Sequence, residues 1–105
     1  MHHSFTGLAI ALRYELLNEG VPPDLIIMYG SQAKGTARED SDIDIAVVSR
    51  KFGKDRFAEG MLVNRAAWRV DKRVEAVPIS VKDYFDRGNV SPLLHEIKTY
   101  GILLL

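Results

Sequence analysis

Two aspartates and a glycine–serine pair stand at the ends of two apolar stretches. The stretches 25–29 and 43–48 are rich in Ile and Val, which is typical of β-strands. Gly30-Ser31 follows the first stretch, and Asp42 and Asp44 stand at the start of the second. Residues two apart on a strand point to one face, roughly 6.5–7 Å apart. Two carboxylates held this close favour a cation, and Mg²⁺ is the natural candidate because it takes carboxylates together with phosphate oxygens.

The glycine–serine pair indicates where phosphates would bind. A glycine at a strand end lets the backbone turn sharply and lets a ligand approach closely. The N–H groups of Ser31 and Gln32, with the Ser31 hydroxyl, would then face an anion at the start of the next turn. A phosphate-binding corner beside a metal-binding pair predicts a triphosphate site.

This pattern resembles the signature of the DNA polymerase β-like nucleotidyltransferase superfamily. The signature is a Gly-Ser pair, ten residues and then Asp-x-Asp, here Gly30-Ser31 and Asp42-Ile43-Asp44. The fuller string is similar to the minimal nucleotidyltransferases (MNT proteins), and it reads GSQAKGTAREDSDIDIAVV. Many MNT proteins are the antitoxin partners of HEPN-type toxins.

The resemblance also implies a third carboxylate, on the strand after a crossover helix. Glu75 is the only acid in the stretch 73–80. If this strand lies next to the strand with Asp42 and Asp44, the alternation of side chains places Glu75 on the same face as the two aspartates. The family often has Asp here, so the longer Glu alters the geometry of a second metal. The alternative is a Glu75 that only faces solvent.

For function, the resemblance implies transfer of AMP from ATP to a hydroxyl of a partner protein, a HEPN-type toxin. Asp42, Asp44 and Glu75 would hold two Mg²⁺ ions, and Gly30, Ser31 and Gln32 would bind the nucleotide. Two alternatives stay open. One is a non-catalytic antitoxin of the same fold that binds the toxin, and the other is a nucleotidyltransferase acting on an RNA end or a small molecule.

Length and composition favour a single domain over residues 1–105, which the resemblance implies is a minimal nucleotidyltransferase domain. The chain has 47% hydrophobic and 27% charged residues, as in an ordinary globular domain. Its 14 basic and 14 acidic residues leave no excess charge to bind a long nucleic acid. Cysteine is absent, which excludes thiolate zinc. No apolar run approaches the roughly 20 residues of a membrane span and no signal peptide is visible, so we expect a cytoplasmic protein.

The pattern of the remaining chain predicts an α/β (α+β) fold, a small mixed β-sheet with helices packed on it. Apolar periodicity and capping residues predict helices over 5–19, 56–70, 81–87 and 92–100, and strands over 25–29, 43–48, 73–80 and 102–105. The helix between the second and third strands supplies the crossover that a parallel pair needs. This element order is compatible with a polymerase β-like nucleotidyltransferase core.

Four further expectations concern parts of the chain outside the candidate site. The helix after Asp55 would bury a stripe formed by Phe57, Met61, Leu62, Ala66 and Val70. The basic turn 50–54 is a solvated loop or, alternatively, brings Lys51 or Lys54 near the triphosphate. The first helix and the apolar segment 102–105 are candidate surfaces for a partner or a second copy of the chain. Residues 1–3, with their two histidines, would be a frayed start without a metal role.

Overall fold

A computed structural model describes the backbone of residues 3–105 and the side chains of residues 5–105. The expectation for Met1 and His2, and for the side chain of His3, lies outside the described part. The elements follow in the order α1 (His3–Asn18), β1 (Leu25–Tyr29), α2 (Gly30–Lys34), β2 (Ile43–Ser49), α3 (Arg56–Val70), β3 (Val74–Ser80), α4 (Val81–Phe85), α5 (Pro92–Tyr100) and β4 (Ile102–Leu103).

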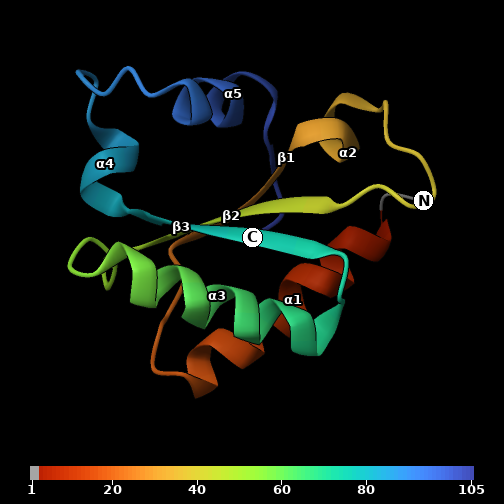
Figure 1. The fold of residues 1–105 in the computed structure, drawn as a ribbon, viewed down its shortest axis with the longest axis horizontal. Helices are drawn as coiled ribbons and strands as arrows, with labels where there is room; N and C mark the ends of the chain where they lie inside the picture. The colour runs from red at the N-terminus through yellow and green to blue at the C-terminus, as the bar shows by residue number, and fades with distance from the viewer. Residues whose placement is uncertain (1–2) are drawn as a thin grey trace.

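The strands form one mixed sheet in the order β3-β2-β1-β4 (Figure 1). β1 pairs antiparallel with both β2 and β4, whereas β2 and β3 are parallel. A parallel pair needs a crossover connection, and α3 provides it. The expected mixed sheet, its parallel pair and a C-terminal strand are therefore confirmed, and that strand lies at the edge of the sheet.

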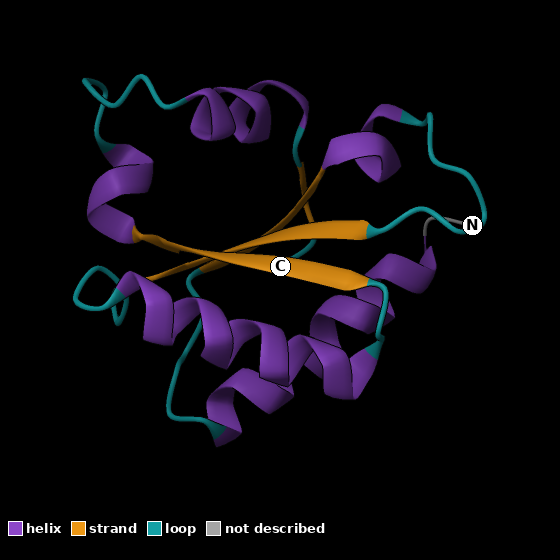
Figure 2. Cartoon of the chain, in the orientation of Figure 1, coloured by secondary structure: helices purple, strands orange, loops and turns teal. Residues whose placement is uncertain are grey.

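Helices cover both faces of the sheet, as Figure 2 shows. Alternation along the strands divides the apolar residues between two cores. The core under α1 and α3 contains the strand residues Ile26, Met28, Ile43, Ile45, Val47, Val74 and Ala76. The core under α4 and α5 contains Ile27, Ala46, Val48 and Ile79. Asp44 lies between Ile43 and Ile45 in β2, so its side chain is on the α5 face.

Side-chain caps start three of the helices where the sequence predicts. Asp55 accepts a hydrogen bond from the N–H of Ala58 (3.1 Å) at the start of α3. Ser80 accepts one from Asp83 (3.0 Å) before α4, and Ser91 caps α5 ahead of Pro92. In the part of the chain that the structure describes, no helix is both long and apolar enough to cross a membrane.

The buried stripe predicted for α3 is partly wrong. Phe57 and Met61 are 79% and 55% exposed, while the buried residues of the helix are Val63, Ala66 and Ala67. Small alanines let α3 pack closely between α1 and β3, so the face that contains them is the inner one. The larger apolar residues are left on the outer face of α3.

Candidate active site

The three acids and the glycine predicted from the sequence meet at one end of the sheet. β1 ends there, and the parallel strands β2 and β3 begin there (Figure 1). Asp44 is the partner of Tyr29 in the antiparallel register and of Glu75 in the parallel register. The order across the sheet is therefore Glu75, Asp44 and then Tyr29, which Gly30 follows. Asp42 is exposed and directly precedes β2.

Gly30 lies directly against the carboxylate of Asp44. A Cβ atom on residue 30 would overlap Asp44 Oδ2, and the φ angle of Gly30 is +72°, a conformation that residues with a side chain rarely adopt. Ser31 and Gln32 follow as half-buried residues of α2, the short helix that packs beside β2. The glycine thus brings the turn from β1 into α2 against one of the predicted metal ligands.

A tight turn orients the chain just before Asp42. The N–H of Arg38 donates to Ser41 Oγ (2.7 Å), and the N–H of Ser41 donates to the carbonyl of Arg38 (3.1 Å). The N–H of Ile43 then donates to the carbonyl of Arg73 (2.9 Å), which joins the start of β2 to the start of β3. The backbone on both sides of Asp42 is therefore held by hydrogen bonds.

The electrostatic character of this end of the sheet is negative. Burial raises the pKa of Asp44, and the neighbouring charges of Glu75, Asp42 and Glu96 raise it further. Burial, with the charges of Asp44, Glu75 and Glu96, also raises the pKa of Tyr29 to about 12. The phenol therefore stays protonated at neutral pH. A bound cation between the acids would offset this repulsion.

The donor set fits Mg²⁺ bound together with a ligand that brings its own oxygens. Among the described side chains, those of residues 5–105, no group of three or more His, Cys, Asp or Glu is arranged to hold a metal ion by itself. Mg²⁺ usually takes one or two carboxylates plus substrate phosphates, and it keeps several waters. Asp44 with Asp42 can supply those carboxylates, so the residues present fit a Mg–triphosphate and not a metal bound by protein alone.

Sequence reasoning missed three residues beside this end of the sheet. The negative charge of Glu96, on α5, raises the pKa of both Asp44 and Tyr29. Its carboxylate pairs with Lys34 Nζ of α2 at 3.6 Å, and the same Nζ lies 4.8 Å from the ring centroid of Tyr100. Burial of Leu94 and Ile97 in the core under α5 brings Glu96 there. Nothing local to residue 96 signals this placement.

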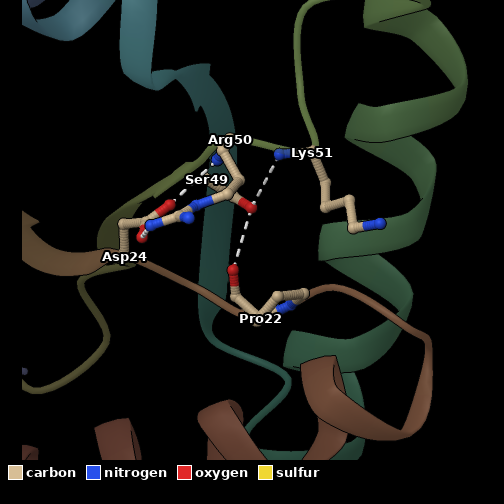
Figure 3. Close-up of polar contacts among 5 residues, drawn as sticks. All are labelled: Pro22, Asp24, Ser49, Arg50 and Lys51. Atoms are coloured by element: carbon tan, nitrogen blue, oxygen red, sulfur yellow. Dashed lines mark hydrogen bonds and ion pairs between the residues drawn. The ribbon is translucent and has the colours of Figure 1, made fainter.

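The alternative that places Lys51 or Lys54 near the triphosphate is wrong. Both follow the far end of β2, where Ser49 is separated from Asp44 by roughly 17 Å at about 3.3 Å per residue. Figure 3 shows the structural role of that end. Ser49 is fully buried; it donates to the carbonyl of Pro22 (2.9 Å) and accepts from the N–H of Lys51 (3.1 Å). The turn is a solvated connection tied to the start of β1.

Comparison with known proteins agrees with the geometry. Residues 13–98 match the sequence model of the family described as Nucleotidyltransferase domain. The chain is 32% identical over 66 residues to the probable protein adenylyltransferase MntA of Haemophilus influenzae, and the alignment covers 59% of this chain. It spans 58% of the length of that relative, less than two thirds.

Solved structures share the fold. One is a toxin–antitoxin crystal structure with AMP-PNP, with 26% identity, a TM-score of 0.61, and coverage of 95% of this chain and 72% of that one. Another is a mutant of the toxin–antitoxin MntA-HpeT, with 26% identity, a TM-score of 0.56, and coverage of 88% and 68%. A putative nucleotidyltransferase from Sulfolobus solfataricus (18% identity, TM-score 0.63, coverage of 93% and 77%) agrees in fold alone.

Proposed function

The chain belongs to the nucleotidyltransferase domain family, and we propose that it moves AMP from ATP to a hydroxyl group of a partner protein. In this proposal residues 1–105 act as one minimal nucleotidyltransferase domain in the cytoplasm, and the acceptor is a HEPN-type toxin that the chain neutralises as an antitoxin. The similarity to MntA supports the reaction, and the similarity to toxin–antitoxin structures supports the class of partner.

The observation that carries the proposal is the contact between Gly30 and Asp44, with Glu75 on the other side of Asp44. The glycine belongs to the turn that would bind phosphates, and Asp44 would bind the metal that holds those phosphates. Their contact brings the two predicted halves of a triphosphate site together. Neither a structural glycine nor a solvent-facing acid requires such a contact.

The order across the sheet supports a separate side of Asp44 for each substrate. Gly30, Ser31 and Gln32 lie on the β1 side of Asp44, where they would bind the triphosphate. Glu75 lies on the β3 side, where it would complete a metal site next to the acceptor hydroxyl. Two bound Mg²⁺ ions would neutralise charge on the triphosphate and would lower the pKa of the acceptor hydroxyl.

The transfer itself balances without a further reactant. The acceptor oxygen forms a bond to the α-phosphorus, and the bond from that phosphorus to the oxygen bridging the α- and β-phosphates breaks. Pyrophosphate leaves with the bonding electron pair, and the hydroxyl proton passes to solvent. Asp42 and Asp44 would keep the triphosphate in line for this displacement through the metal that they would bind.

Label transfer from ATP to the acceptor tests the proposal. The chain, Mg²⁺ and a purified HEPN-type toxin are incubated with ATP labelled in the α-phosphate or, in a parallel reaction, in the γ-phosphate. We expect the α-label on the toxin and the γ-label in pyrophosphate, with neither product when Asp44→Asn replaces the unmodified chain. A complex that forms without label transfer would mean neutralisation by contact alone. Label on the end of an RNA, when RNA replaces the toxin in the reaction, would redirect the activity to nucleic acid.

A further inference from the structure

An apolar groove runs along the outer edge of the sheet between α3 and β3. Figure 1 shows α3 alongside β3. We name this surface the α3 groove; its cavity of about 580 Å³ is lined by Phe57, Met61 and Trp68 together with Arg56, Arg65 and Glu75. The three apolar side chains are 79%, 55% and 55% exposed. Steps of four and seven residues place them on one face of the helix. Apolar side chains gathered in this way mark an interaction surface.

The outer edge of β3 cannot accept another strand. The side-chain amide of Asn64 donates to the carbonyl of Ala76 (2.8 Å) and accepts from its N–H (2.8 Å). Trp68 Nε1 donates to the carbonyl of Val74 (3.0 Å), and Pro78, two residues further along the same edge, has no N–H to offer. Side chains of α3 thus occupy the hydrogen-bonding groups that an added strand would need. An occupant of the groove must bind through its side chains.

Glu75 joins the α3 groove to the candidate active site. It lines the groove and is the register partner of Asp44 on the β3 side. In the proposed reaction this is the side on which the acceptor hydroxyl approaches. A protein bound along α3 would therefore have part of its surface next to the acids of the site.

Positive charge flanks the apolar floor. Arg56 is exposed at the start of α3. Arg65 pairs with Glu19 at 3.5 Å, yet 51% of its side chain remains exposed. An occupant with acidic residues beside an apolar stripe would complement both features. An amphipathic helix presents such a stripe at three- and four-residue steps, and it satisfies its own backbone groups.

We propose that the α3 groove binds the acceptor protein through an amphipathic helix that carries acidic residues beside its apolar stripe. The inference rests on the proposed function, because it identifies the surface by which the same acceptor reaches the same site. Phe57 and Met61 enter the apolar contact, Arg56 and Arg65 face the acidic residues, and Glu75 marks the end of the groove at which transfer occurs.

Matched double variants test this surface. Phe57→Ala with Met61→Ala removes an aromatic and an aliphatic side chain four residues apart on the exposed face of α3. Tyr14→Ala with Ile10→Ala does the same on α1, where these residues are 64% and 57% exposed. With a purified HEPN-type toxin as the probe, we expect the α3 pair to raise the KM for the toxin about tenfold or more and to leave kcat and Mg-ATP affinity unchanged. The α1 pair should change none of them.

A charge variant and a mass measurement complete the experiment. Arg56→Glu should also raise the KM for the toxin, and the effect should shrink at high salt. Equal KM values for the two double variants would overturn the groove while leaving the proposed function intact. Two other results would also overturn the proposal. A lower Mg-ATP affinity in the α3 double variant would assign the groove to the nucleotide. If the unmodified chain sediments as a dimer and only the α3 double variant dissociates it, the groove would belong to a second copy of the chain. Absence of transfer by the unmodified chain would overturn both.

Discussion

Gly30 contacts the carboxylate of Asp44 so closely that no side chain fits at residue 30. The two residues come from different strands, β1 and β2, which pair antiparallel with Tyr29 opposite Asp44. The contact joins the turn that we propose binds phosphates to the acid that we propose binds the metal. Substitution of either residue should therefore weaken the binding of both the triphosphate and the metal.

Gly30→Ala should lower both stability and Mg-ATP affinity. The positive φ angle alone strains any residue with a Cβ atom by about 1–3 kcal/mol, and the Cβ would displace the Asp44 carboxylate. Ser31→Ala should be milder, because it removes one hydroxyl contact of about 0.5–1.5 kcal/mol and leaves the backbone N–H groups. Calorimetry of Mg-ATP binding checks the ranking, and a larger loss in Ser31→Ala would contradict the role of the backbone.

Gly7→Ala is the matched glycine control. Gly7 lies in α1 with open space around its Cβ position and without a positive φ angle. Alanine there should raise the free energy of unfolding by about 0.5–1 kcal/mol through helix propensity and leave Mg-ATP affinity unchanged. Urea unfolding of the two glycine variants would then give shifts of opposite sign.

Asp44→Asn should make the chain more stable at neutral pH. The pKa of Asp44 in the folded state is raised above its ordinary 3.8, so the folded chain binds this proton more tightly than the unfolded chain does. The Asp44 contribution to the free energy of unfolding therefore falls as pH rises from below 3.8 through the raised pKa. Asparagine stays uncharged at every pH. Urea unfolding should give Asp44→Asn a higher free energy of unfolding than the unmodified chain at about pH 7, and the difference should vanish near pH 3. A difference that grows toward low pH would contradict the prediction.

Glu75→Gln should separate turnover from nucleotide binding. Asp42 and Asp44 remain to hold the triphosphate-bound metal, so Mg-ATP affinity should be nearly unchanged. Turnover should fall by a factor of about 10²–10⁴, the range typical when activation of a nucleophile is lost. Glu75→Asp keeps the charge and should recover part of the rate. Equal rates for all three forms would leave Glu75 as a solvent-facing strand residue.

Ser49→Ala should destabilise the fold without any effect on nucleotide binding. Its buried hydroxyl joins the carbonyl of Pro22 to the N–H of Lys51 (Figure 3), and both groups lose a partner in the variant. A loss of about 0.5–1.5 kcal/mol for each hydrogen bond removed is typical. Asp24→Asn, which breaks the nearby exposed pair with Arg50, should cost less. Weaker Mg-ATP binding in Ser49→Ala would contradict the separation of the two ends of β2.

Local patterns predict the elements of the site. The Ile- and Val-rich stretches, the glycine between strand and turn, and the alternation of Asp42 and Asp44 all act over a few residues, so they can be recognised without the fold. The helix caps Asp55, Ser80 and Ser91 are equally local, and the structure confirms each one. Glu75 was a candidate only through the family resemblance, because one acid in a strand carries no signal of its partners.

Long-range packing decides what remains. The parallel register places Glu75 beside Asp44, and the packing of α5 brings Glu96 into the same electrostatic environment. Helical periodicity places Phe57 and Met61 on an apolar stripe, but it cannot tell which face of α3 turns inward. The alanines of that helix decide this, since only small residues allow close packing between α1 and β3. By itself the sequence predicted the candidate residues Gly30, Ser31, Asp42 and Asp44 and the order of the elements, because these depend on near neighbours. The meeting of those residues and the exposure of the α3 groove were decided by the tertiary structure, because contacts between distant segments set both.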